Sequence, residues 1–107
     1  MNDLTWSPGE KAAARKAFDL ALKRELDDVV RKTKERAARI QEPSDLWKLE
    51  RYLTERRKEI DSKYDYRYSV LLWVFIRLRQ EGRLTEEELQ GLSQDKLDRI
   101  RRGMGIL

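Results

Sequence analysis

The sequence predicts an all-α protein in which two long antiparallel helices form a dimerisation stalk and a small helical head follows. Three observations predict this fold. Apolar residues recur at spacings of three and four, helix-capping residues precede those stretches, and charged residues make up 41% of the chain and alternate in sign. A chain of 107 residues is expected to form one domain, with the stalk at about 7–62 and the head at about 63–103.

The first helix is expected to begin at Ser7. Ser7 suits the N-cap, Pro8 suits the first helical position, and Glu10 completes a capping box. An apolar stripe then runs for roughly nine turns. Its members are Phe18, Leu22, Leu26, Val29, Thr33, Ala37 and Ile40. A stripe this narrow is typical of a helix that packs against one long neighbour.

The segment QEPSD, residues 41–45, is expected to separate the first helix from the second. The residue before Pro43 avoids the helical conformation, and Ser44 can cap the second helix. The inward stripe of the second helix consists of Leu46, Leu49, Leu53 and Ile60. We assign the first three to a homodimer interface, because a chain this short has a thin core of its own.

Trp47 does not belong to that inward stripe. At 100° per residue it lies on a neighbouring face with Arg51, while Glu50 and Arg57 lie at the boundary between the two. Two interpretations are open. The indole either covers the edge of the helix bundle or anchors an interface with another protein, as tryptophan and arginine often do.

Residues 64–81 are expected to form a helix that is apolar on every side and therefore covered on every side. A β-strand at 70–76 is the alternative, but the sequence offers no second strand to pair with it. Glycines and capping residues then mark a short helix and a last helix. These boundary residues are Gly82, Thr85, Gly91, Ser93 and, near the end, Arg102.

The composition argues against an enzyme. The chain has no histidine and no cysteine, so the usual base near neutral pH and the usual thiol nucleophile are both missing. The carboxylates at 86–88 are better explained by the helix dipole than by a metal site, so neither a metal nor another cofactor is expected. No export signal or membrane span is recognisable, which predicts a cytoplasmic protein that acts by binding another protein.

The charge balance does not predict a nucleic-acid partner. The net charge is +4, but 24 basic residues are interleaved with 20 acidic ones. Only the end of the chain, with Arg99, Arg101 and Arg102, forms a basic cluster. Because no aromatic platform or groove-reading motif accompanies this cluster, nucleic-acid binding is not expected.

Residues 44–70, SDLWKLERYLTERRKEIDSKYDYRYSV, and residues 74–82, VFIRLRQEG, resemble the fluorescence recovery protein family of cyanobacteria. LWKL, EID, KYD and QEG occur in one ungapped frame, which covers nearly the whole chain. The frame also includes RELD at 24–27 and a set of single residues. These are Trp6, Ser7, Leu89, Leu92, Asp95, Lys96 and Ile100.

The resemblance implies an all-helical homodimer that binds the photoactivated red form of the orange carotenoid protein, mainly through the C-terminal domain of that protein. It further implies that binding speeds the return to the orange form and ends quenching at the phycobilisome. No covalent step is needed for this, because a ligand that favours one conformer shifts the equilibrium. The implied partner-binding residues are Trp47, Glu50, Arg51, Arg57 and Trp73.

The sequence also departs from the family pattern. Where the pattern has His-Asp after WKL, this chain has Glu50 and Arg51, so an acidic contact position has become basic. Trp73 and Gly91 stand where phenylalanines are expected. Two interpretations therefore remain open: a recovery protein with a re-matched partner, or a divergent member that has no carotenoid-protein partner and serves as an interaction module for another protein.

Overall fold

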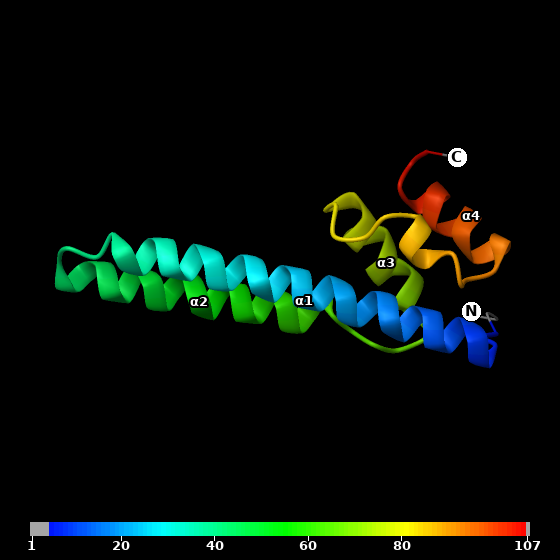
Figure 1. Ribbon diagram of the computed structural model, residues 1–107, viewed down its shortest axis with the longest axis horizontal. Coiled ribbons are helices and arrows are strands. Elements are labelled where there is room, and N and C mark those ends of the chain that lie inside the picture. The colour runs from blue at the N-terminus through cyan, green and yellow to red at the C-terminus, as the bar shows by residue number, and fades with distance from the viewer. Residues whose placement is uncertain (1–4, 107) are drawn as a thin grey trace.

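The computed structural model describes residues 5–106, and in that part of the chain it contains helices and no strands. The elements are α1 (Pro8–Ala38), α2 (Pro43–Lys63), α3 (Leu71–Gln80), the short 3-10 helix η1 (Glu87–Leu89) and α4 (Gln94–Gly103). The predicted all-α class is confirmed. The two long helices form an antiparallel hairpin, and the remaining elements lie against the N-terminal part of α1 in a molecule of 53 × 27 × 26 Å (Figure 1).

The beginnings of α1 and α2 follow from local capping. The Glu10 amide donates to the Ser7 hydroxyl over 3.1 Å, and the Ser7 amide donates back to the Glu10 carboxylate over 3.1 Å, as expected. The expectation that Ser44 caps α2 was wrong, because the N-cap is Glu42. Pro43 suits the first helical position, where no amide hydrogen is needed, so the cap must precede it.

The third apolar helix begins seven residues later than expected, because residues 64–70 form a connection and not a helical turn of α3. Tyrosines alternate along this connection. The rings of Tyr64 and Tyr66 lie 5.4 and 4.9 Å from that of Phe18 on α1, both edge-on. A two-residue alternation is the period of an extended chain, so packing against α1 overrides helix formation here. Gly82, with a φ of 74°, ends α3 as expected.

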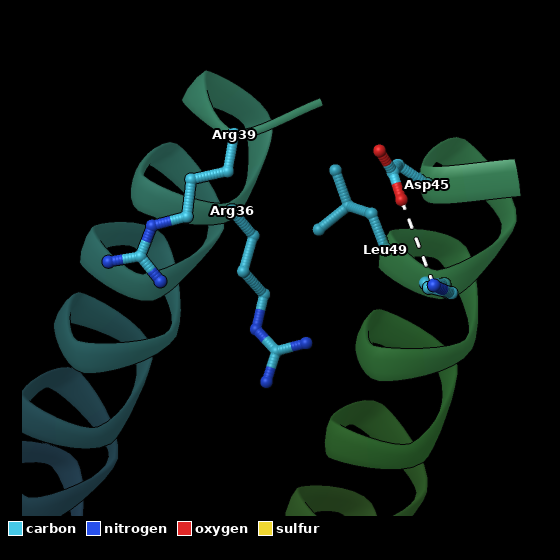
Figure 2. A pocket seen from close by; sticks show the side chains of 5 residues that line it. Arg36, Arg39, Asp45 and Leu49 are labelled. Carbon is cyan, nitrogen blue, oxygen red and sulfur yellow. Dashed lines mark ion pairs between the residues drawn. The ribbon is translucent and has the colours of Figure 1, made fainter. Parts of the chain in front are cut away.

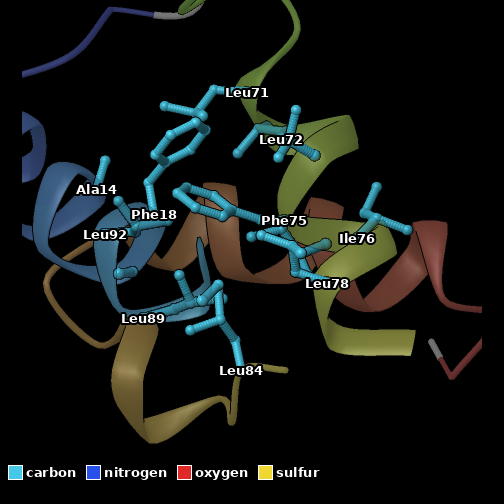
Figure 3. Close-up of a cluster of buried hydrophobic side chains, with 14 of the residues drawn as sticks. Ala14, Phe18, Leu71, Leu72, Phe75, Ile76, Leu78, Leu84, Leu89 and Leu92 are labelled. Atoms are coloured by element: carbon cyan, nitrogen blue, oxygen red, sulfur yellow. The ribbon is translucent and has the colours of Figure 1, made fainter. Parts of the chain in front are cut away.

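The apolar core lies between the first half of α1 and the head (Figure 3). Small residues on α1 allow the head to approach closely. The buried apolar residues of α1 are three alanines, Ala14, Ala17 and Ala21, together with Phe18. Members of the same core cluster in the head include Leu71, Phe75, Leu78, Leu84, Leu89 and Leu92. The core stripe is therefore made largely of alanines and only partly of the larger residues that the sequence pattern singled out.

The rest of the hairpin has almost no core of its own. No residue from Leu26 to Glu59 is buried, and within α2 only Ile60 and Lys63 are. The expectation that α3 is covered on every side was also wrong, because Trp73 remains 70% exposed. The head is too small to surround α3, and this side of the helix has no neighbour within the described chain.

Candidate partner-binding surfaces

Large apolar side chains lie uncovered on both helices of the hairpin. On α2, Leu46 is 48% exposed and Leu53 is exposed as well, while on α1 the same is true of Leu26 and Val30. Contiguous exposed apolar residues on a charged surface are typical of an interface. Within one chain, this part of α2 therefore lacks the partner that its leucine spacing predicts.

Leu49 differs from its two neighbours on the stripe. It is half-buried and lines a shallow pocket at the tip of the hairpin with Arg36, Arg39, Asp45 and Lys48 (Figure 2). Asp45 accepts hydrogen bonds from the Gln41 and Glu42 amides, and these bonds hold its pKa below the usual range. The carboxylate thus serves the connection between the helices.

The four sequence-predicted residues of α2 lie on its solvent-facing surface. Trp47 is 62% exposed, and Glu50 and Arg51 are exposed beside it. Arg57 is also exposed and lies 3.8 Å from Asp61. At 3.6 residues per turn the four positions span about a third of the circumference of α2. An exposed indole flanked by both signs of charge can bind a partner that offers an apolar pocket with a polar rim.

The structure does not bring Trp73 together with these residues within one chain. Trp73 lies on α3 in the head, whereas Trp47 lies in the second turn of α2, at the opposite end of the molecule (Figure 1). The five predicted residues therefore form two separate surfaces, one that runs along α2 from Trp47 near the tip of the hairpin to Arg57, and one on the head.

Two members of the basic cluster are already paired with acids. Arg99 lies 3.0 Å from Asp95, and Arg101 forms an ion pair with Glu86. The hydrogen bond from Arg101 holds the pKa of Glu86 below its usual range. These pairs reduce the positive charge that the end of α4 presents.

A buried ion cluster joins both long helices to the head, and the sequence did not predict it. Glu25 on α1 is 1% exposed. It accepts hydrogen bonds of 2.7 Å from Lys63, 2.7 Å from Arg56 and 2.8 Å from the Tyr64 hydroxyl. Arg83 Nε lies 3.3 Å from the same carboxylate. The signals in the sequence were that Glu25 continues the spacing of the buried alanines of α1 and that it lies in the RELD segment at 24–27.

The chemistry of this cluster keeps Glu25 ionised. Burial alone raises the pKa of a carboxyl group, but hydrogen bonds from Lys63, Tyr64 and Arg56 outweigh it and hold the pKa of Glu25 below its usual range. Lys63 also donates over 2.7 Å to Glu81, at the end of α3. Residues of α1, α2 and the head are thus joined through two carboxylates and one buried ammonium group.

The described residues offer no obvious place for a metal ion. Between residues 5 and 106 no group of three or more potential ligands is suitably arranged. Over the same range, no helix is both long and apolar enough to cross a membrane.

The chain is similar to proteins of one family. The family described as photoprotection regulator fluorescence recovery protein matches residues 6–102. A fluorescence recovery protein of Synechocystis sp. PCC 6803 is 42% identical over 96 residues, which are 90% of this chain and 88% of that protein. The structure of the Fremyella diplosiphon fluorescence recovery protein has a TM-score of 0.88 and 41% identity, covering 96% of this chain and 100% of that one. The Synechocystis structure has a TM-score of 0.88 at 40% identity, covering 92% and 97%.

Proposed function

The chain belongs to the photoprotection regulator family of fluorescence recovery proteins, and from this membership we propose that it is a homodimeric adaptor for the photoactivated orange carotenoid protein. By binding the C-terminal domain of the red form, it speeds the return to the orange form and ends quenching at the phycobilisome. The proposed place of action is the cytoplasm. The observation that carries this proposal is the exposed Trp47 among charged residues on α2 of a chain from this family.

The proposed dimer rests on the uncovered hairpin. A helix pair in which no residue from Leu26 to Glu59 is buried gains little stability from its own packing. A second copy laid against Leu46 and Leu53, with Leu49 beneath them, removes that apolar surface from water. Leu26 and Val30 on α1 add to the surface available for such a contact.

The proposed docking surface centres on Trp47, with Glu50 and Arg51 beside it, and extends along the same side of α2 to Arg57. Trp and Arg carry a large share of binding energy in protein interfaces, because they combine apolar area with directed polar contacts. Trp73 on the head is the second proposed contact. Since it lies far from Trp47 in one chain, a partner that touches both must be long or must contact two protomers (Figure 1).

The proposed mechanism involves no covalent chemistry and no cofactor. A protein that binds one conformer of its partner more tightly than the other shifts the balance between them. To raise the rate, it must bind the species at the top of the barrier more tightly still. Exposed side chains on a stable scaffold are sufficient for this role, so the chain acts as a regulator and not as an enzyme.

The test is the red-to-orange absorbance decay of an orange carotenoid protein in the dark. We expect the chain to accelerate the decay and Trp47→Ala to lose most of that acceleration, with a cost of about 2 kcal/mol or more for a central anchor. Lys48→Ala, the neighbouring exposed residue, is the matched control and should retain the acceleration. A wild-type chain that leaves the decay unchanged would contradict the proposal.

The second candidate function is an interaction module for a different protein. The observation that favours it is Arg51, which is exposed at a position where the family pattern is acidic. Like charges forced together at an interface cost more than a lost rim ion pair, so a partner with a basic spot there would be rejected. Failure of the wild-type chain in the decay test, with a dimer present, would favour this candidate.

A further inference from the structure

We infer that the buried cluster around Glu25 and Lys63 is the anchor that fixes α2 against the head, and thereby positions the Trp47 surface relative to Trp73. This rests on the proposed function for the role of the two surfaces, but the anchoring itself is a property of the free protein. Lys63 donates hydrogen bonds of 2.7 Å to Glu25 of α1 and 2.7 Å to Glu81, the C-cap residue of α3, so one ammonium group joins α2 to α1 and to the end of α3.

The need for such an anchor follows from where the core lies. The head is held on α1 by an apolar core, which includes Ala17, Phe18 and Phe75. By contrast, α2 buries only Ile60 and Lys63, both in its last turn. Apolar packing thus determines how the head lies on α1, whereas charge pairing largely determines how α2 lies on both. A buried ionic cluster is well suited to this, because it tolerates few alternative arrangements of its partners.

A small tilt of α2 at the cluster produces a large displacement at the other end of the helix. Trp47 lies 16 positions before Lys63 on the same helix, which is about 24 Å at the rise of an α-helix. A tilt of about 10° at the anchor therefore moves the indole by about 4 Å. The short connection between α1 and α2 holds the tip near α1, but no buried residue between Leu26 and Glu59 resists sideways motion of α2.

Spin-label distances in the free protein provide the test, and the absence of cysteine from the chain makes the labelling clean. One pair joins α2 to the head, at Glu55→Cys and Gln94→Cys. The control pair joins α1 to the head, at Lys16→Cys and Gln94→Cys. All three sites are exposed. Mixing the labelled protein with an excess of unlabelled protein suppresses the distances between the two protomers of a dimer. In the wild type, both pairs should give one narrow distance.

The decisive variant is Lys63→Met, which keeps the size of the side chain and leaves Glu25 paired with Arg56 and Tyr64. We expect the α2–head pair to lose its single narrow distance while the α1–head pair keeps it. Lys48→Met removes an exposed lysine from the same helix and should change neither distance. An unchanged α2–head distance in Lys63→Met would overturn the inference, and so would equal broadening of both pairs.

The consequence for partner binding is measured separately. If the competent arrangement falls to about a tenth of the population, the apparent affinity for the carotenoid protein falls roughly tenfold. The acceleration of the red-to-orange decay by Lys63→Met should therefore need roughly tenfold more protein. Full retention of acceleration with a broadened α2–head distance would overturn the positioning role. If the wild type does not accelerate the decay, that result counts against the proposed function. The spin-label distances would still show whether the cluster fixes α2 against the head.

Discussion

Gly91 lies where the head closely approaches α1. A Cβ atom added there would lie 2.2 Å from the Cβ of Ala13, so any side chain must push the two elements apart. This gives a physical reason for the glycine where the family pattern has a phenylalanine. In this chain the space that such a ring would need is taken by α1.

The first prediction is that Gly91→Ala destabilises the protein by about 1–3 kcal/mol, the usual cost of overpacking. The double variant Gly91→Ala with Ala13→Gly should lose less unfolding free energy than the two single variants lose together, because removing the Ala13 methyl group makes room for the new one. Urea unfolding measures this. Gly9→Ala, which meets only Ser7 Oγ at 4.0 Å, is the control and should not destabilise. Equal effects at both glycines would contradict the argument.

The Glu10 carboxylate joins the beginnings of α1 and α4. It accepts hydrogen bonds of 2.9 Å from the Ser93 amide and 2.9 Å from Lys96. The bond from Lys96, together with that from the Ser7 amide, lowers the pKa of Glu10 from 4.5 to about 2. Because the pKa is lower in the folded state, the ionised group stabilises the fold above pH 4.5, and this contribution disappears as the pH falls towards 2.

The second prediction follows from the lowered pKa of Glu10 in the folded state. Glu10→Gln should lower the free energy of unfolding at neutral pH by about 1–2 kcal/mol, allowing for screening by solvent. It should also reduce the fall in stability between pH 4.5 and 2. Urea unfolding across this pH range tests both statements. Asp27→Asn, at an exposed carboxylate 2.8 Å from Lys23, is the control and should change the free energy of unfolding at neutral pH less than Glu10→Gln does. An identical slope in Glu10→Gln would contradict the assignment.

At the scale of single residues, the sequence predicted what local chemistry determines. Ser7 and Pro8 were recognised because capping depends on neighbours in the chain. The buried role of Glu25 was not recognised, because its partners Lys63 and Arg83 lie far along the sequence and a glutamate on a charged helix is usually exposed. The alanines of the core were missed for a similar reason, since alanine favours helices wherever it occurs.

At the scale of elements, α2 is the helix whose sequence and environment disagree most within one chain. Its leucine spacing predicted an inward face, and the chain alone leaves Leu46 and Leu53 exposed. The beginning of α3 shows the opposite case. Residues 64–70 have no strong helix breaker, yet the tyrosine contacts with Phe18 hold them in a connection, and such contacts cannot be read from local propensity.

The third prediction tests the proposed dimer, in which the exposed leucines of α2 form the interface. Leu53→Glu places a charge on the proposed interface, at a cost of about 3–5 kcal/mol if it stays unpaired there. We expect light scattering to report half the mass of the wild type. Because Leu53 is exposed within one chain, the helix content measured by circular dichroism should remain close to that of the wild type. Leu49→Glu is a poorer choice, since that side chain also lines the pocket at the tip of the hairpin with Arg36 of α1.

Thr54→Glu provides the matched control for this prediction, because Thr54 is the next exposed residue and lies off the leucine stripe. It should leave the mass unchanged. A wild-type chain that is already monomeric at micromolar concentration, or a dimer that survives both Leu46→Glu and Leu53→Glu, would show that the interface lies elsewhere.

At the scale of the whole molecule, the two proposed surfaces and the anchor between them decide which partner fits. On α2, Trp47 and Arg51 lie near the tip of the hairpin, at a distance from the head, and Arg57 lies closer to the head. The head itself carries Trp73 on α3 (Figure 1). The fold needed to present them was predictable, because helix periodicity extends over long stretches. Their relative placement was not, because it depends on the Glu25 cluster and on the core of the head.

The last prediction concerns Arg51, where the chain departs from the family pattern. If that position faces a basic spot on the carotenoid protein, Arg51 introduces like charge there, once in each protomer. The lost rim pair is worth about 0.2–1 kcal/mol, so the repulsion matters more than the missing attraction. Arg51→Asp should therefore bind a typical orange carotenoid protein better, chiefly through a faster association rate at low salt, and should speed the dark return to the orange form.

Glu50→His is the control for Arg51→Asp, because it restores the other family residue without reversing the charge at position 51. It should have the smaller effect. Raising the salt concentration should narrow the difference between Arg51→Asp and the wild type, since screening weakens exposed charges most. If the wild type already accelerates the decay as well as Arg51→Asp does at low salt, the partner of this chain does not present a basic spot there. Arg51 would then belong to an interface whose partner surface is compatible with a basic residue, and binding would not have been lost.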